Sequence, residues 1–212
     1  FDNIRIERGY VAPLNDFRRL VMHWPVYPAL LIWLLWNFAP GSATPLQYYL
    51  QNDLHATDAQ WGQWNAVATA SFIPMYLVFG LLCRSVALRT LLFWGTVFAI
   101  PQFVPFLFIH SVNAALVAAV LIGVLGGVAT AAYVDLLIRS CPPGLQGSVL
   151  MMAGGLLYIA QRLGDVLGTL LYEQSGGFSS CVVAITVVYA LIVPVLRWVP
   201  KILVATADGQ AA

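Results

Sequence analysis

The sequence predicts an all-α membrane protein in which six transmembrane helices form one bundle. Two observations lead to this fold class. Of the 212 residues, 60% are hydrophobic and only 9% are charged, whereas a soluble domain carries about 25% charged residues. In addition, apolar stretches of about 20 residues, enough to cross roughly 30 Å of hydrocarbon, recur along the chain with short polar links between them. We therefore expect the chain to lie in a lipid bilayer.

Six stretches satisfy this length. In chain order the predicted spans are residues 25–50, 62–83, 91–109, 114–138, 148–173 and 178–200. They form one bundle over residues 25–200, preceded by a basic amphipathic segment at 1–24 and followed by a short tail at 201–212. The chain begins at Phe1 rather than Met, which suggests a processed or truncated chain.

The basic residues predict the orientation of these spans. The sequence has ten Lys and Arg residues, and all except Arg162 fall on one side of the predicted membrane: Arg5, Arg8, Arg18, Arg19, Arg84, Arg89, Arg139, Arg197 and Lys201. The opposite side carries Asp53, Asp58 and Glu173. Because cytoplasmic loops are enriched in Lys and Arg, we expect a multi-pass protein of the cell (inner) membrane with both termini in the cytoplasm.

The composition and motifs argue against several functional classes. A net charge of +1 gives no reason to expect nucleic acid as a partner. Cys83, Cys141 and Cys181 form no CxxC motif and no Cys/His cluster, so no metal site is expected. No G-x-S-x-G, H-E-x-x-H or P-loop motif occurs. We expect neither an enzyme nor a bound cofactor.

The span at 148–173 carries polar residues along one helical face. Steps of three and four place Gly155, Tyr158, Arg162, Asp165, Thr169 and Tyr172 on this face, with Gln161 beside it. An intramembrane charge costs roughly 2.5–3.5 kcal/mol on insertion scales and usually faces a water-filled path. The continuous face therefore favours a solute cavity with Arg162 and Asp165 in it. The alternative is that these two residues only neutralise each other and join two helices.

Two further features concern the backbone around this face. Gly164-xxx-Gly168 lies on an adjoining face and favours close helix packing. In the first span Pro40-Gly41 interrupts the helix, and irregular backbone at membrane depth lines a cavity or is buried in protein. Trp33, Asn37, Gly41, Thr44 and Tyr48 share one face of this span. We assign Trp33 and Asn37 to the solute site; a simple proline kink packed against a neighbour is the alternative.

Aromatic and charged residues complete the candidate site. Trp36 is expected either to stack on the solute with Trp33 or to face lipid. In the fourth span Thr130 follows Gly123, Gly126 and Gly127, which indicate a packing surface, and Thr130 is assigned to the site. Asp135 lies four residues before Arg139 near the cytoplasmic end of this span. The two form either an ion pair at the membrane surface or a gate contact that breaks and re-forms during transport.

The third and sixth spans differ from the other four. Their apolar stretches, "LLFWGTVFAIPQFVPFLFI" and "CVVAITVVYALIVPVL", contain no charge and almost no polar stripe. Such helices can face lipid on all sides. We therefore expect the third and sixth spans to be peripheral and the other four to lie in the interior.

This division resembles one half of a major facilitator superfamily transporter, in which each half is built of two inverted three-helix repeats. In that family the third and sixth helices of a half stay outside, and the first and fourth line the cavity. The stretch "LLWNFAPGSATPLQYYLQNDLHATDAQWGQWNA" resembles the seventh helix and following loop of the folate–biopterin transporter branch, and "DLLIRSCPPGLQGSVLMMAGGL" resembles the tenth and eleventh helices of that branch. The resemblance implies a C-terminal half, with residues 1–24 as the linker between halves.

The resemblance also implies a function. It is secondary active transport, in the manner of a symporter, of a small anionic or aromatic solute by alternating access. Arg162 would bind the anionic group, Asp165 would hold Arg162 or carry a coupling proton, and Tyr158 would stack on the solute. The implied partner is a second six-helix half, either the N-terminal half of the same protein or a separate chain. The alternative function is a non-transporting subunit that scaffolds a larger membrane complex.

Overall fold

The computed structural model describes residues 18–19, 22–142, 144–175 and 177–205. Every regular element in these ranges is helical. In chain order they are α2 (Val26–Asn37), α3 (Thr44–Tyr48), the π-helix η1 (Tyr49–Asp53), α4 (Asp58–Leu82), α5 (Leu88–Ala99), the 3-10 helix η2 (Ile100–Phe108), α6 (Val112–Arg139), α7 (Gln146–Ser175), α8 (Ser179–Val195), the 3-10 helix η3 (Leu196–Trp198) and α9 (Lys201–Val204). The all-α prediction is therefore confirmed for the described part of the chain.

Side-chain caps fix the start of two long helices. The Thr57 hydroxyl accepts from the backbone N–H of Gln60, and the Gln60 side chain accepts from the backbone N–H of Thr57 at 2.8 Å. Ser111 accepts from the backbone N–H of Ala114 in the same way before α6. Because these caps satisfy N–H groups that have no partner within the helix, α4 and α6 begin a few residues before their predicted spans.

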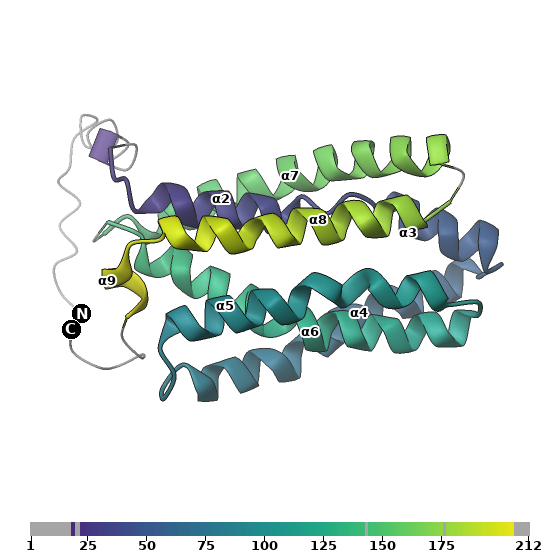
Figure 1. The fold of residues 1–212 in the computed structure, drawn as a ribbon, viewed down its shortest axis with the longest axis horizontal. Coiled ribbons are helices and arrows are strands. Elements are labelled where there is room, and N and C mark those ends of the chain that lie inside the picture. The colour runs from purple at the N-terminus through teal and green to yellow at the C-terminus, as the bar shows by residue number, and fades with distance from the viewer. Residues whose placement is uncertain (1–17, 20–21, 143, 176, 206–212) are drawn as a thin grey trace, which may run out of the picture.

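The helices pack as two groups in an elongated bundle (Figure 1). In one group α2 packs against α7 and α8, and in the other α6 packs against α4 and α5. Contacts of α2 with α6, and of α8 with α5 and η2, join the two groups. Helices α2 and α6, which correspond to the first and fourth predicted spans, each pack against two helices of their own group and against each other.

The core contains a cluster of aromatic and hydroxyl side chains. The Trp36 ring stacks on Tyr189, with 4.6 Å between the ring centroids, and meets Tyr133 edge-on at 5.3 Å. The hydroxyls of Tyr133 and Thr96 are hydrogen-bonded at 2.7 Å. Trp36 is buried by these contacts, so it neither faces lipid nor presents its ring to a solute, and both expectations for it are corrected.

The third and sixth predicted spans each bury one face. Thr96 and Gln102 of the third span and Tyr189 of the sixth are buried, whereas Phe98 and Val187 on their outer faces are exposed. These spans therefore do not face outward on all sides, as helices without a polar stripe can, but on one side only. The sequence does not reveal the buried face because isolated Thr, Gln and Tyr residues form no continuous polar stripe along the helix.

In the part of the chain that the structure describes, four helices are long and apolar enough to cross a membrane: Asp58–Leu82, Leu88–Phe108, Val112–Arg139 and Ser179–Trp198. The other two predicted spans do not meet this standard in the described residues. The first is divided into α2, a break and α3–η1, of which only Val26–Asn37 is a shorter apolar helix. The fifth is the single helix α7, whose mean hydropathy is lowered by Gln161, Arg162 and Asp165.

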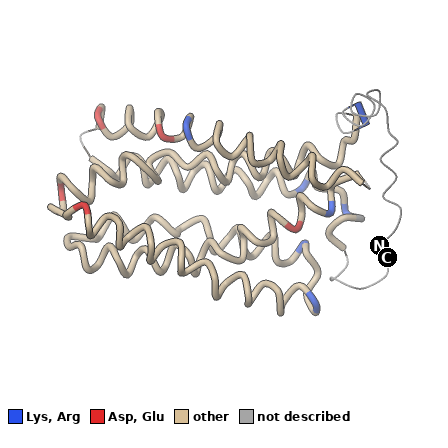
Figure 2. Tube along the Cα trace, turned by 180° about the vertical axis from the view of Figure 1, so that it is seen from behind, with Lys and Arg blue, Asp and Glu red and all other residues tan. Residues whose placement is uncertain are grey.

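Charge is segregated along the bundle. Figure 2 shows most blue segments at one end and most red segments at the other, while α7 carries one of each along its length and one red segment lies at the blue end. The helix connections explain this pattern, because the α4–α5 link, the end of α6 and the end of α8 lie at one end and carry Arg84, Arg139 and Arg197. The opposite end holds Asp53 and Asp58, which flank the η1–α4 link. The described structure thus agrees with the charge asymmetry on which the predicted orientation rests.

Candidate functional site

The most irregular backbone within the bundle lies between α2 and α3. Helix α2 ends at Asn37 and helical structure resumes at Thr44, so the predicted interruption at Pro40-Gly41 is confirmed. Gly41 has a φ of 101°, a conformation that glycine adopts without strain and other residues rarely do. A methyl group at Gly41 would also overlap the Cβ of Cys181 on α8. Conformation and space therefore both require glycine here.

Helix α7 packs directly on this interrupted backbone. A methyl group at Gly168 would overlap backbone atoms of Pro40 and Gly41, and one at Gly164 would press on the backbone of Ala39. The Cys181 thiol adds a contact at the same crossing, since it donates to the Gly168 carbonyl at 3.3 Å. The close packing predicted for Gly164-xxx-Gly168 is therefore confirmed, and its partner is irregular backbone rather than a regular helix.

Asp165 ties α7 to the start of α3. One carboxylate oxygen accepts the Thr44 backbone N–H at 2.9 Å, and the other accepts the Thr44 hydroxyl at 2.8 Å. The first N–H groups of a helical segment have no partner within it and attract a carboxylate. Among the described residues Asp165 forms no ion pair with Arg162, so the expectation that Asp165 holds Arg162 is corrected. Its carboxylate is engaged by Thr44 instead.

Arg162 has no hydrogen-bond or ion-pair partner in the described part of the chain, and its side chain is exposed near the middle of α7. Tyr158, with 69% of its surface exposed, precedes it by one turn, and Gln161 is exposed beside it. A guanidinium carries five N–H donors in a planar fork that suits a carboxylate or phosphate. Arg162 is thus a cation that no described residue neutralises, in the middle of a helix.

Trp33 and Asn37 serve the packing of α2. The Trp33 indole N–H donates to the Ala153 carbonyl on α7 at 3.0 Å, and the Asn37 amide donates to the Trp33 carbonyl at 2.8 Å. Both polar groups therefore have partners inside the chain. Trp33 and Asn37 lie near the interrupted backbone, as predicted, but these contacts give them a structural part in fixing α2 against α7.

Thr130, Asp135 and Arg139 belong to a different region. Thr130 donates its hydroxyl to the Gly126 carbonyl at 2.9 Å, and together with Asp135 it lines a cavity of about 400 Å³ between α4 and α6. Arg139 and Asp135 form an ion pair of 3.0 Å at a spacing of four residues, which is the contact that both interpretations of this pair require. Arg162 and Asp165 do not line this cavity, so the predicted site residues fall into two separate groups.

Thr44 is a site residue that the sequence alone does not identify. The helical pattern places it on the polar face of the first span but indicates no partner for it. The available signal was Thr44-Pro45 after a helix break, because proline is common in the first turn of a helix. This signal predicts a new helix start, and such a start requires an acceptor for its free N–H groups.

These observations define the class of protein: a helical, multi-pass membrane protein with an interrupted helix and an unpaired arginine in the middle of another. The model of the MFS_1 like family matches residues 16–183, and the chain belongs to this family of the major facilitator superfamily. Membership points to a transporter rather than an enzyme. No curated protein matches the chain.

Proposed function

We propose that this chain is one six-helix half of a secondary transporter that moves a small anionic or aromatic solute by alternating access. The observation that carries the proposal is the unpaired, exposed Arg162 on α7, within one helical turn of the Asp165–Thr44 contact. An unneutralised guanidinium is unfavourable against hydrocarbon, and intramembrane cations face protein or a water-filled path. A cavity completed by a second half provides both.

In this proposal Arg162 binds the anionic group of the solute through two parallel hydrogen bonds. Tyr158 presents an exposed ring one turn away, on which a planar solute can stack. Gln161 adds a neutral hydrogen-bonding group beside the guanidinium. A carboxylate on an aromatic ring combines the features that these three side chains recognise, and this is the solute chemistry that we propose.

Asp165 is proposed to couple solute binding to movement of the interrupted helix. The carboxylate holds the Thr44 N–H and hydroxyl, and a protonated carboxyl cannot accept both bonds as strongly. Protonation of Asp165 would therefore loosen α3 from α7, and the same carboxyl would carry the proton that a symporter moves with its solute. The Asp135–Arg139 pair, which borders the cavity between α4 and α6, is proposed as the gate at the basic end.

The packing of the helices supports two inverted repeats. The proposed six spans are α2–η1, α4, α5–η2, α6, α7 and α8–η3. An inverted repeat relates the first span to the fourth, the second to the fifth and the third to the sixth. The packing follows this relation. The contact of α2 with α7 has its counterpart in that of α6 with α4, and the contact of α2 with α8 has its counterpart in that of α6 with α5. The contacts α2–α6 and α5–α8 are their own counterparts in this relation. A two-fold relation between triplets is the arrangement expected of a transporter half.

The second half is proposed to cover α4 and α7. In the most apolar window of α4 only 6% of the residues are buried, against 44% for α6. Helix α7 leaves Tyr158, Leu163 and Val166 exposed around Arg162. A partner across α4 and α7 would enclose Arg162 and complete the cavity. We propose that this partner is a further six-helix unit, with the basic ends of both units in the cytoplasm and residues 1–24 linking them.

A labelling experiment tests whether Arg162 faces water. In a background with Cys83, Cys141 and Cys181 replaced by Ala, Arg162→Cys and Val187→Cys are compared in the assembled membrane protein. Val187 is exposed on the outer face of α8 and serves as the lipid-facing control. A water-soluble methanethiosulfonate needs an ionised thiol, so we expect it to modify position 162 and to spare position 187. An unreactive position 162 would argue against the water-filled site.

The second candidate function is a scaffold subunit of a larger membrane complex. The breadth of the exposed apolar surface on α7, which includes Met151 and Leu163, favours it because such a surface also suits permanent contact with another protein. The two candidates differ at Arg162. A scaffold would bury it against the partner and leave the cysteine at 162 unlabelled, whereas a transporter would keep it accessible and protect it when solute binds.

A further inference from the structure

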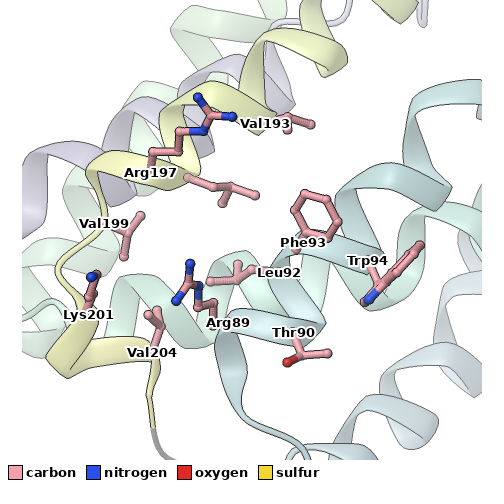
Figure 3. Close-up of a pocket in the computed structure, with 11 residues that line it drawn as sticks. Arg89, Thr90, Leu92, Phe93, Trp94, Val193, Arg197, Val199, Lys201 and Val204 are labelled. Atoms are coloured by element: carbon pink, nitrogen blue, oxygen red, sulfur yellow. The ribbon is translucent and has the colours of Figure 1, made fainter.

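A second cavity lies at the basic end of the bundle, on the side formed by α5 and the end of α8. Its volume is about 360 Å³, and Figure 3 draws the residues that line it. The lining comes from the first turns of α5, from α8 and η3, and from the segment that leads into α9. These helices are the third and sixth spans, whereas the faces of the proposed solute site are on α4 and α7.

Three cations line this cavity. They are Arg89 on α5, Arg197 on η3 and Lys201 on α9, and no acidic residue is among the lining residues. In the described part of the chain none of the three forms an ion pair with an Asp or Glu, and all three are exposed. In Figure 3 the Arg89 side chain extends into the space bordered by Val199, Lys201 and Val204. The cavity therefore has a positive charge that the described residues do not neutralise.

The rest of the lining is apolar and graded from buried to exposed. Leu92, Val199 and Val204 are buried and form the floor, whereas Phe93 and Trp94 are exposed. Tryptophan is enriched where membrane and water meet, because its ring is apolar and its N–H needs a polar partner. Trp94, with 53% of its surface exposed, therefore indicates that the mouth of the cavity lies at headgroup level.

We infer that this cavity binds the headgroup of an anionic phospholipid. The phosphate diester would lie among Arg89, Arg197 and Lys201, and the first carbons of the acyl chains would run along Phe93 and Val193 toward the exposed outer faces of α5 and α8. A basic cavity between transmembrane helices is the recognised arrangement for such headgroups. The volume of about 360 Å³ accommodates a headgroup and glycerol rather than a whole lipid, so the chains remain in the bilayer.

A soluble phosphate compound has the negative charge of a phospholipid headgroup but lacks its acyl chains. Phe93, Trp94 and Val193 offer it nothing, since a free phosphate gains no energy from apolar walls. The cations alone would not hold it at physiological salt, where exposed charges are strongly screened. The combination of three cations with an apolar wall that continues onto lipid-facing helices is what selects a lipid.

The test uses the full chain, purified in detergent and titrated separately with phosphatidylglycerol and phosphatidylcholine while bound lipid is counted by native mass spectrometry. Each Lys or Arg near an anionic surface contributes a several-fold preference. We expect phosphatidylglycerol to bind about tenfold more tightly than phosphatidylcholine. The double variant Arg89→Gln with Lys201→Gln should lose most of that preference. The matched control, Arg18→Gln with Arg84→Gln, removes the same charge from the same end outside the cavity and should keep the preference.

Three further results decide the proposal. Equal loss in both double variants would mean general attraction to the basic end and would overturn it, as would the absence of any preference in the natural chain. Displacement of phosphatidylglycerol by glycerol phosphate would assign the cavity to a soluble phosphate instead. Quenching of Trp94 at the mouth of the cavity is a further measurement. The Trp94 signal is the emission lost in Trp94→Phe, and phosphatidylglycerol with brominated acyl chains should quench it more than brominated phosphatidylcholine does. Equal quenching would contradict the site.

Discussion

The two longest helices, α6 and α7, differ in what surrounds them. Helix α6 has 28 residues, and twelve of them are buried. Helix α7 has 30 residues, and only five are buried, all of them Val, Ala or Gly. The polar groups of α6 are satisfied within the chain, as Thr130, Tyr133 and Asp135 show, whereas Arg162 of α7 is not. An apolar composition therefore does not predict burial by the chain's own helices. Helix α6 is enclosed largely by this chain, whereas most of α7 is not.

Small residues also serve the two helices differently. Gly123 and Gly127 of α6 let it approach the regular helix α4, chiefly at the side chains of Ser71 and Met75, although the backbone carbon of Ser71 is also within overlap distance. Gly164 and Gly168 of α7 approach backbone atoms of the break between α2 and α3. Side chains can adjust to a neighbour by changing rotamer, but a backbone fixed by a glycine at positive φ cannot do so without moving the segment. The few contacts that hold α7 therefore depend on glycine at Gly164 and Gly168.

The largest effect is expected at Gly168. Gly168→Leu forces a side chain into the backbone of Pro40 and Gly41, and overpacking costs about 1–3 kcal/mol or more where the neighbour cannot yield. We expect this variant to fold poorly, as measured by the fraction of protein that elutes as a single species from size-exclusion chromatography in detergent. Gly155→Leu on the same helix is the control, because nothing lies within 4 Å of the added Cβ there. Similar behaviour of the two variants would contradict the α7 crossing.

The next effect is expected at Asp165. Asp165→Ala leaves the Thr44 N–H and hydroxyl without their acceptor, which costs about 1–3 kcal/mol in a buried setting. Thr44→Val removes only the hydroxyl and should cost about half as much. A double-mutant cycle measured by thermal unfolding should show coupling between positions 165 and 44 and none between 165 and 162. Coupling to Arg162 instead would restore the ion pair that the sequence suggested.

The limits of prediction from the sequence are clearest at this same contact. The break at Pro40-Gly41 and the close approach at Gly164-xxx-Gly168 follow from residues that act locally, and both are present. The bond between Asp165 and Thr44 joins positions 121 residues apart, and no local pattern contains it. Proximity in the sequence instead predicts Arg162 as the partner of Asp165. Trp36 shows the same limit, because only the fold brings it against Tyr133 and Tyr189.

A smaller effect on stability is expected at Arg162, where the effect on transport is large. Arg162 has no partner among the described residues, so Arg162→Leu should change the unfolding free energy by less than about 1 kcal/mol, in contrast to Asp165→Ala. Uptake of aromatic carboxylates by the assembled transporter in vesicles should be lost. Arg162→Lys keeps the charge but not the planar fork and should recover little uptake. Uptake near the natural level for Arg162→Leu, at matched amounts of folded protein, would remove Arg162 from the solute site.

The smallest effect is expected at Leu163, next to Arg162 on α7. Its side chain is 59% exposed, and within a membrane an exposed leucine contacts lipid that is as apolar as its protein neighbours. Leu163→Ala should therefore change the stability of the chain alone by less than about 0.5 kcal/mol. Leu137→Ala on α6 is the matched control, since Leu137 is buried and its loss leaves a cavity in the core.

The same pair of variants also tests whether a second half covers α7. Once the second half is supplied, Leu163→Ala should weaken its association, because a leucine packed at a protein interface loses contacts that lipid does not replace. Leu137→Ala should leave that association unchanged at matched folding. If Leu163→Ala has no effect on association either, α7 faces lipid at this position, and the exposed surface that distinguishes it from α6 is not the interface of the transporter.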